Sequence, residues 1–285
     1  MAQHDTKVHD SGPSTNAHFD QLSNKYEDFI GLVTGAIGRY ALDSLISAPT
    51  QDSVIHDNAC GTGLITEHFQ HIAVKTGTSA KKIHATDFVE SVTQVLQRKA
   101  DQSDWKNVEI SVMDSQELPF PDNHFDLSIT NFGIFFLPDP QKGADHIYRT
   151  TKPGGTAVVT TWKERRIMNT IIEAQRTIRP DLPTLGSPWA ELWSKEETLR
   201  NVLVHAGFKP ENVEIVERRT DAVVETFLRD LDIVTRSYPA ATEGWTEDEK
   251  SRLGKEMLRV AKERDPEGGG VGGLYFVAFI AVARK

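Results

Sequence analysis

The hydrophobic positions of the chain fall into two alternating patterns. Short apolar runs that end in turn residues are followed by longer stretches whose apolar side chains recur at helical spacing. The runs predict strands over residues 53–57, 82–86, 108–112, 125–130, 156–162, 212–218 and 274–283. The longer stretches predict helices over residues 62–74, 89–100, 139–151, 167–178, 195–206, 225–236 and 246–264. Strands that alternate with helices in this way indicate an α/β fold built on a mostly parallel sheet.

The two ends of the chain differ from its middle. Residues 1–16 hold almost no apolar side chains and are predicted to be a disordered leader. Residues 17–46 have the spacing of two amphipathic helices, and after Trp162 extra helical stretches separate the strands. We therefore expect a single domain over residues 17–285. Its core would comprise residues 48–162, 207–220 and 270–285, and a helical cap would comprise residues 17–47, 163–206 and 221–265.

Composition narrows the class of protein. The chain has 285 residues, of which 38% are hydrophobic and 26% charged, as in ordinary globular domains. A net charge of −9 disfavours nucleic acid as a partner, and no apolar run approaches the ~18 residues of a membrane span. A polar N-terminus and a lone cysteine, Cys60, predict a cytoplasmic protein without a secretory signal. We expect a small-molecule substrate, no metal, and a monomer or weak homodimer.

A glycine-rich segment follows the first predicted strand and opens a helix. It reads Asp-Asn-Ala-Cys-Gly-Thr-Gly over residues 57–63. Small residues let a backbone pass close to a ligand, and a helix N-terminus offers free N–H groups. By itself the segment fits a dinucleotide site or a simple tight turn equally well. Cys60 has no His–acid pair readable nearby, so we interpret it as a packing residue rather than a nucleophile.

Acidic residues follow the next two predicted strands. Asp87 comes after the second strand, where a carboxylate can accept both hydroxyls of a ribose. Asp114 comes after the third, where a carboxylate could accept from an adenine amino group. Either residue alone could be a helix cap or a turn former. Together with Asp57 they place carboxylates at successive strand ends, which favours a nucleoside site.

Further motifs complete the pattern. They are Leu-Pro-Phe-Pro-Asp at 118–122, Phe-Asp-Leu at 125–127, Thr-Asn-Phe-Gly at 130–133 and Lys-Pro-Gly-Gly at 152–155. In this order the chain resembles class I S-adenosylmethionine-dependent methyltransferases of the group related to ubiquinone/menaquinone C-methyltransferases. The resemblance implies a Rossmann-like, seven-stranded, mostly parallel sheet with helices on both faces and a helical cap. Residues 57–63, the helical leader and Leu-Tyr-Phe at 274–276 most resemble fungal secondary-metabolite methyltransferases, which include gliotoxin-type thiol S-methyltransferases.

The resemblance also implies a cofactor, S-adenosylmethionine, and residues that contact it. These are Tyr26, Asp57, Ala59, Gly61, Thr62, Gly63, Asp87, Phe88, Asp114, Ser115, Asn131 and Phe132. In that assignment Asp87 holds the ribose, Phe88 packs on the adenine and Asp114 accepts from its amino group. Tyr26 fits core packing equally well. The family usually has glycine where this chain has Ala59, and alanine is expected to be tolerated there if φ is negative.

Aromatic residues near the predicted cap are candidates for the acceptor site, although core packing would explain them equally well. They are Phe19, Phe135, Phe136 and Trp162. No His–acid pair stands on the readable loops, which mildly favours S- or N-methylation, or a base supplied by the cap. A thiol can react as the thiolate with little help. We therefore expect methyl transfer to a small, largely apolar metabolite, foremost a thiol. O- or N-methylation and cofactor binding without turnover remain alternatives, and a nicotinamide oxidoreductase fits the motifs poorly.

Overall fold

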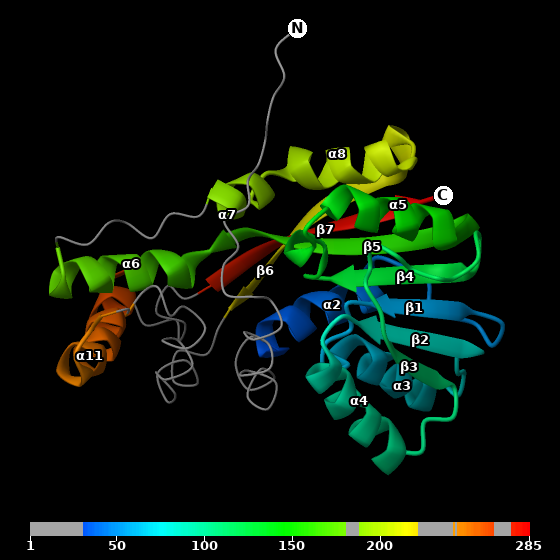
Figure 1. The fold of residues 1–285 in the computed structure, drawn as a ribbon, viewed down its shortest axis with the longest axis horizontal. Helices are drawn as coiled ribbons and strands as arrows, with labels where there is room; N and C mark the ends of the chain where they lie inside the picture. The colour runs from blue at the N-terminus through cyan, green and yellow to red at the C-terminus, as the bar shows by residue number, and fades with distance from the viewer. Residues whose placement is uncertain (1–30, 181–187, 222–241, 243, 265–274) are drawn as a thin grey trace, which may run out of the picture.

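The computed structural model describes residues 31–180, 188–221, 242, 244–264 and 275–285 (Figure 1). Its sheet has the order β3-β2-β1-β4-β5-β7-β6, with β7 antiparallel to both neighbours and the remaining pairs parallel. This confirms the predicted Rossmann-like α/β fold. The strands are β1 Val54–Asn58, β2 Lys82–Asp87, β3 Val108–Val112, β4 Phe125–Asn131, β5 Thr151–Arg165, β6 Val213–Asp221 and β7 Tyr275–Arg284.

The order of the strands creates a crevice beside β1. The chain first moves outward from β1 to β3 and then returns to place β4 on the other side of β1. The connections after β1 and β4 therefore leave in opposite directions. In open α/β sheets, ligands bind at this point, outside the carboxyl ends of the strands.

Helices cover the sheet as the periodic stretches predict. The helices are α2 Leu32–Ser44, α3 Leu64–Thr76, α4 Glu90–Gln102, α5 Pro140–Thr150, α6 Arg166–Ile178, α7 Pro188–Trp193, α8 Glu196–Ala206 and α11 Glu247–Arg264, with short 3₁₀ turns η2 Ile134–Phe136 and η3 Pro210–Asn212. Local caps explain several boundaries. Asp139 accepts the N–H of Lys142 at the start of α5, and Thr246 pairs reciprocally with Glu249 at the start of α11. The helix predicted over residues 225–236 lies outside the described residues.

Two expected boundaries differ from the structure because of backbone geometry. The helix predicted from Thr62 begins at Leu64, since Gly63 has a φ of +90° and cannot continue a right-handed helix. The Lys-Pro-Gly-Gly segment, predicted to precede a strand, lies inside β5. Thr151 pairs with Phe125 and Thr156 with Leu127, so the residues between them bulge out of the ladder.

The bulge is anchored by the end of β7 rather than by its own turn. The N–H of Gly154 donates to the carbonyl of Lys285 at 2.9 Å, and the N–H of Lys285 donates to Gly155 at 3.1 Å. The Lys285 ammonium also donates to the carbonyl of Tyr148 at 2.8 Å. These long-range bonds keep the backbone of the segment in the sheet.

Two clusters of buried apolar side chains form the interior. The larger lies between the sheet and helices α2, α3, α5 and α8. The smaller joins α6 and α11 with Val33 of α2 and Phe276 of β7, and Trp162 packs against both clusters. Figure 1 shows α6 and α11 together at one end of the molecule, away from β1 to β3. No helix among the described residues is long and apolar enough to cross a membrane.

Histidine and phenylalanine rings pack on one face of β1 and β2. His56 is fully buried, stacks on Phe125 at 4.6 Å between ring centroids, and shares a hydrogen bond of 2.9 Å with Thr86. Burial, reinforced by His84 and His124, lowers the pKa of His56 to about 3 from an ordinary value of 6.5. The imidazole is therefore neutral in the folded protein above about pH 3.

This burial predicts a specific acid sensitivity. Between about pH 6.5 and pH 3 the unfolded chain binds a proton at His56 that the folded chain does not, so the free energy of unfolding falls as the pH falls. Its contribution is about 1.4 kcal/mol per pH unit. Urea unfolding at pH 6 and pH 5 measures how much the free energy of unfolding falls with pH. His56→Gln should remove the contribution of His56 to that fall. Equal slopes for the two proteins would contradict the assignment.

Candidate functional site

The loop after β1 approaches the loop after β4 closely. Ala59 and Gly61 both have a φ of +54°, the left-handed region. The condition under which alanine is expected to be tolerated, a negative φ, is therefore not met at Ala59. A Cβ atom built on Gly133 would lie 2.4 Å from the Cβ of Ala59, so the Ala59 methyl group occupies the space beside Gly133. The two loops thus touch at the crevice beside β1.

Asp87 fastens this loop to the end of β2. Its carboxylate accepts the N–H of Gly61 at 2.8 Å and the N–H of Val89 at 2.9 Å. Burial raises the pKa of Asp87, while these N–H donors act in the opposite direction. The sequence-predicted residues Gly61 and Asp87 are therefore brought together. Phe88, the next residue, is 53% exposed and offers an open ring beside them.

Asp57 faces the opposite side of β1 from Asn58. It is buried and accepts from the backbone N–H and the hydroxyl of Thr66 in α3, at 2.9 and 2.6 Å. Burial is the main cause that raises the pKa of Asp57 to about 7. Its described contacts hold α3 against the sheet, so its contact with a cofactor stays a prediction.

The residues after β3 are held from two sides. Ser115 donates from its hydroxyl to Asn58 at 2.8 Å, and Asn58 in turn donates to Thr130 at 3.0 Å. Asp114 accepts the backbone N–H of Gln116 at 2.9 Å and both of its carboxylate oxygens lie near the Gln116 amide. This network brings the ends of β1, β3 and β4 to one edge.

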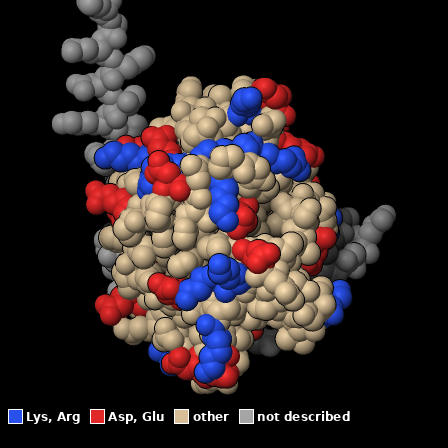
Figure 2. All heavy atoms as spheres, turned by 90° about the vertical axis from the view of Figure 1, so that its right-hand side faces the viewer, with Lys and Arg blue, Asp and Glu red and all other residues tan. Residues whose placement is uncertain are grey.

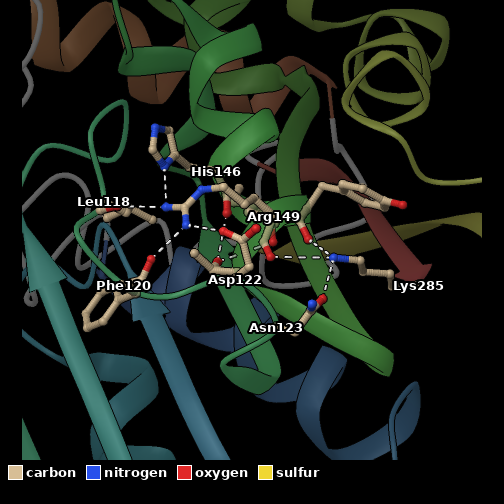
Figure 3. Close-up of polar contacts among 10 residues, drawn as sticks. Leu118, Phe120, Asp122, Asn123, His146, Arg149 and Lys285 are labelled. Atoms are coloured by element: carbon tan, nitrogen blue, oxygen red, sulfur yellow. Dashed lines mark hydrogen bonds and ion pairs between the residues drawn. The ribbon is translucent and has the colours of Figure 1, made fainter.

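Arg149 of α5 fixes the segment that follows Ser115 (Figure 3). Its guanidinium donates to the carbonyls of Phe120 and Leu118 at 2.7 and 2.8 Å, and pairs with Asp122 at 2.8 Å. The guanidinium nitrogen that donates to Leu118 also lies 2.9 Å from His146 Nδ1. Burial and the nearby Arg149 charge lower the pKa of His146, which leaves a neutral ring able to accept from the guanidinium.

Asn131 and Phe132 end β4 at the same edge. Asn131 donates to the carbonyl of Thr34 in α2 at 3.1 Å and accepts from Thr160 at 2.9 Å. Phe132 has a φ of +58°, and its N–H donates to the Thr160 hydroxyl at 2.9 Å. Its ring stacks on Trp162 at 3.9 Å between centroids. The left-handed backbone of Phe132 is therefore supported by a hydrogen bond and a stacked ring.

The candidate acceptor residues form a group of rings beyond β4 and β5. Phe135 lies 4.8 Å from Phe136 and 6.3 Å from Trp193 between ring centroids, and Trp162 contacts Phe276 at 5.2 Å. Phe136 remains 41% exposed. Phe19 and Tyr26 lie outside the described residues, so their predicted roles stay predictions.

Several residues of this edge were not singled out in the sequence. Asn58, Gln116, Thr130 and Thr160 supply the side chains that hold the predicted site residues in place. The available signal was polarity at positions where a buried strand end is usually apolar. Among the described residues, no group of three or more His, Cys, Asp or Glu side chains is arranged to hold a metal ion.

The fold defines a class of protein: a Rossmann-like α/β protein whose strand order reverses between β1 and β4, the point at which open α/β sheets bind ligands. Residues 3–214 match the model of the ubiE/COQ5 methyltransferase family, and the chain belongs to that family. It is therefore a methyltransferase, and the predicted cofactor, S-adenosylmethionine, is confirmed with the family.

Individual relatives agree with this placement. The chain is 27% identical to methyltransferase ktnA of Aspergillus niger, covering 82% of this chain and 85% of the relative. It is 25% identical to methyltransferase tpcH of Aspergillus fumigatus, with coverages of 81% and 84%. The fold is similar to phosphoethanolamine N-methyltransferase 2 of Haemonchus contortus, solved with phosphomonomethylethanolamine and S-adenosylhomocysteine. That match has a TM-score of 0.56 and 16% identity, and covers 93% of this chain and 57% of the other.

Figure 2 shows the side of the molecule where the parallel strands begin. Lysine and arginine alternate there with aspartate and glutamate. Ion pairs such as Lys82–Glu109 and Lys152–Asp126 belong to this end of the sheet. This face therefore carries no extended field of one sign.

The left-handed backbone at Ala59 predicts that glycine is better tolerated there. Ala59→Gly should raise the free energy of unfolding by about 1 kcal/mol, because the Cβ atom disfavours a φ of +54°. Gly61→Ala is the matched control: φ is the same and its Cβ would meet nothing within 4 Å. Gly61→Ala should lower the free energy of unfolding by a similar amount. Urea unfolding measures the change for both variants. A lower free energy of unfolding for Ala59→Gly would show that the Ala59 methyl group is needed for packing.

Cys60 is predicted to be chemically inert in the folded protein. It is 8% exposed and packs with Ala85 and Leu96, and burial raises the pKa of its thiol. Because the thiolate is the reactive form, alkylation by iodoacetamide should be at least about a hundredfold slower in the native protein than in guanidinium chloride. Mass spectrometry gives both rates directly, since the chain has no other cysteine. Comparable rates would mean that the β1 loop opens readily.

Proposed function

We propose that the enzyme transfers the methyl group of S-adenosylmethionine to a small, largely apolar acceptor, and that the acceptor atom is a thiol sulfur. The observation that carries the proposal is the convergence of the β1 loop, Asp87 and Asp114 at the crevice beside β1. Ligands of open α/β sheets bind there. The cofactor supplies an electrophilic methyl group on a sulfonium, so the protein needs no covalent intermediate.

The residues at this edge fit such a cofactor. The loop leaves open space at Gly61, and the buried hydroxyl of Thr62 has no hydrogen-bond partner among the described residues. Asp87 lies where it can accept ribose hydroxyls, and the exposed ring of Phe88 can pack on a base. These groups bind and orient, which is the main requirement for an in-line displacement.

The acceptor side is supported by its rings. Phe136 of η2 and the partly buried Trp162 of β5 offer apolar surface, which the buried ring of Phe135 supports. In this proposal α6 and α11 would form the cap over the acceptor. Three histidines have hydrogen-bond partners away from these rings. His56 pairs with Thr86, His68 with Asp43 and His146 with Arg149. An acceptor that ionises without a protein base suits this arrangement, and a thiol has a pKa of about 8.5 against about 10 for a phenol.

A phenol or an amine as acceptor, or cofactor binding without turnover, are the alternatives. We keep the cytosol as the predicted compartment, and a monomer or weak homodimer as the predicted state. Nucleic acid remains an unexpected partner for a chain with a net charge of −9.

The cofactor assignment is tested first with Asp87→Ala. Calorimetry should show micromolar binding of S-adenosylmethionine and S-adenosylhomocysteine to the wild type and none of NAD. The substitution should weaken both affinities by about 1–3 kcal/mol, because hydrogen bonds to a charged acceptor are lost. Asp101→Ala, on the exposed face of α4, is the control and should bind normally. Unchanged affinity in a folded Asp87→Ala protein would remove the ribose assignment.

The acceptor is then tested with matched compounds. A set of thiols, phenols and amines on the same small aromatic and aliphatic frames would be supplied with labelled S-adenosylmethionine. The proposal expects label on thiols first, at rates that level off above about pH 8.5 as the thiol ionises. Label on phenols or amines alone would reassign the acceptor atom. Cofactor binding with no transfer to any compound would favour the non-catalytic alternative.

A further inference from the structure

The side chain of Gln116 joins Asp114 to the start of α5. Its amide nitrogen lies 3.0 Å from one carboxylate oxygen of Asp114 and 3.1 Å from the other. Its amide oxygen accepts the backbone N–H of Asp139 at 2.9 Å. Since a backbone N–H can only donate, the oxygen end of the amide must face Asp139 and the nitrogen end must face Asp114. The orientation of this amide is therefore set by the end of a helix.

The bonds to Gln116 also determine what Asp114 can still accept. An ionised carboxylate has about four acceptor positions, two on each oxygen. Oδ1 receives the backbone N–H and the side-chain amide of Gln116, and Oδ2 receives the amide alone. Within the part of the chain that the structure describes, one acceptor position on Oδ2 is left. That position suits a single N–H donor and repels an oxygen.

The backbone beside Asp114 is held separately. Ser115 donates to Asn58, which is fully buried between β1 and β4. The main chain of this turn is thus fixed by Asn58, whereas the rotation of the Asp114 carboxylate is fixed by Gln116. The two tasks fall on different side chains and can be separated by substitution.

We propose that Gln116 is a positioning residue that sets the base specificity of the site by orienting Asp114 toward a 6-amino purine. The inference rests on the proposed function, in which Asp114 meets the adenine of the cofactor. It assigns Gln116 no contact with the cofactor. The discrimination it creates is between a ring amino group, which donates to Oδ2, and a ring oxo group, which cannot.

The test compares S-adenosylhomocysteine with its deaminated analogue, S-inosylhomocysteine, by calorimetry. The wild type should bind S-adenosylhomocysteine about tenfold to a hundredfold more tightly than S-inosylhomocysteine. This difference in affinity corresponds to one hydrogen bond to a charged acceptor. Gln116→Met keeps the length of the side chain and removes its amide. This substitution should shrink the preference about fivefold or more by weakening only S-adenosylhomocysteine. Gln97→Met is the matched control, because Gln97 pairs in the same way with Asp101 on the exposed face of α4, at 2.8 Å.

The outcomes separate this inference from the proposed function. Wild-type protein that binds neither compound, or both equally, would overturn the cofactor assignment or the role of Asp114, and Gln116 with it. Wild-type preference that survives in Gln116→Met would overturn the inference alone. Equal weakening of both compounds would show a merely structural role and would likewise overturn it. Thermal unfolding without ligand confirms that each variant is folded.

Discussion

The close approach of the two backbones at Ala59 and Gly133 is a constraint that shapes the carboxyl edge of the sheet. At this point the chain leaves β1 for α3 and leaves β4 for η2 and α5, in opposite directions. The Ala59 methyl group fills the space in which a side chain at position 133 would lie. Ala59 and Phe132 both have left-handed backbones, which non-glycine residues adopt at some energetic cost. Hydrogen bonds from the N–H of Cys60 to Thr86 and from the N–H of Phe132 to Thr160 hold these two segments in place.

Polar residues in β1 carry this constraint into the rest of the sheet. A central parallel strand is usually a run of apolar side chains. Here His56, Asp57 and Asn58 are consecutive and buried, and each has a polar partner in a different segment: Thr86, Thr66 and Ser115. Burial disfavours the cation of His56 and lowers its pKa, so its contribution to the free energy of unfolding falls as the pH falls. Burial disfavours the anion of Asp57 and raises its pKa, so the contribution of Asp57 rises as the pH falls. The strand fixes its neighbours because these groups would be costly to leave unpaired.

Local patterns in the sequence were sufficient for the order and kind of the elements, because apolar periodicity reflects which faces are buried. They predict that Asp87 and Asp114 follow strands and that Gly61 lies in the loop after the first strand. Local patterns do not predict structure that depends on hydrogen bonds to residues far away in the sequence. The pattern predicts a helix over residues 139–151 and a strand over 156–162, whereas residues 152–155 lie within β5 because their backbone hydrogen bonds with Lys285 join distant parts of the chain. The sequence pattern does not predict the roles of Asn58 and Gln116, because each has a distant partner. Ser115 lies 57 positions from Asn58, and Asp139 lies 23 positions from Gln116.

The carboxyl edge of the sheet and the α6–α11 pair meet at one side chain. Trp162 stacks on Phe132, which ends β4, and contacts Phe276, which belongs to the smaller core. The pairing of β5 with β7 is irregular between Trp162 and Glu164, so one extra residue shifts the alternation just before α6 begins. The side chain that joins the two clusters of buried residues therefore lies directly before the irregularity that precedes α6.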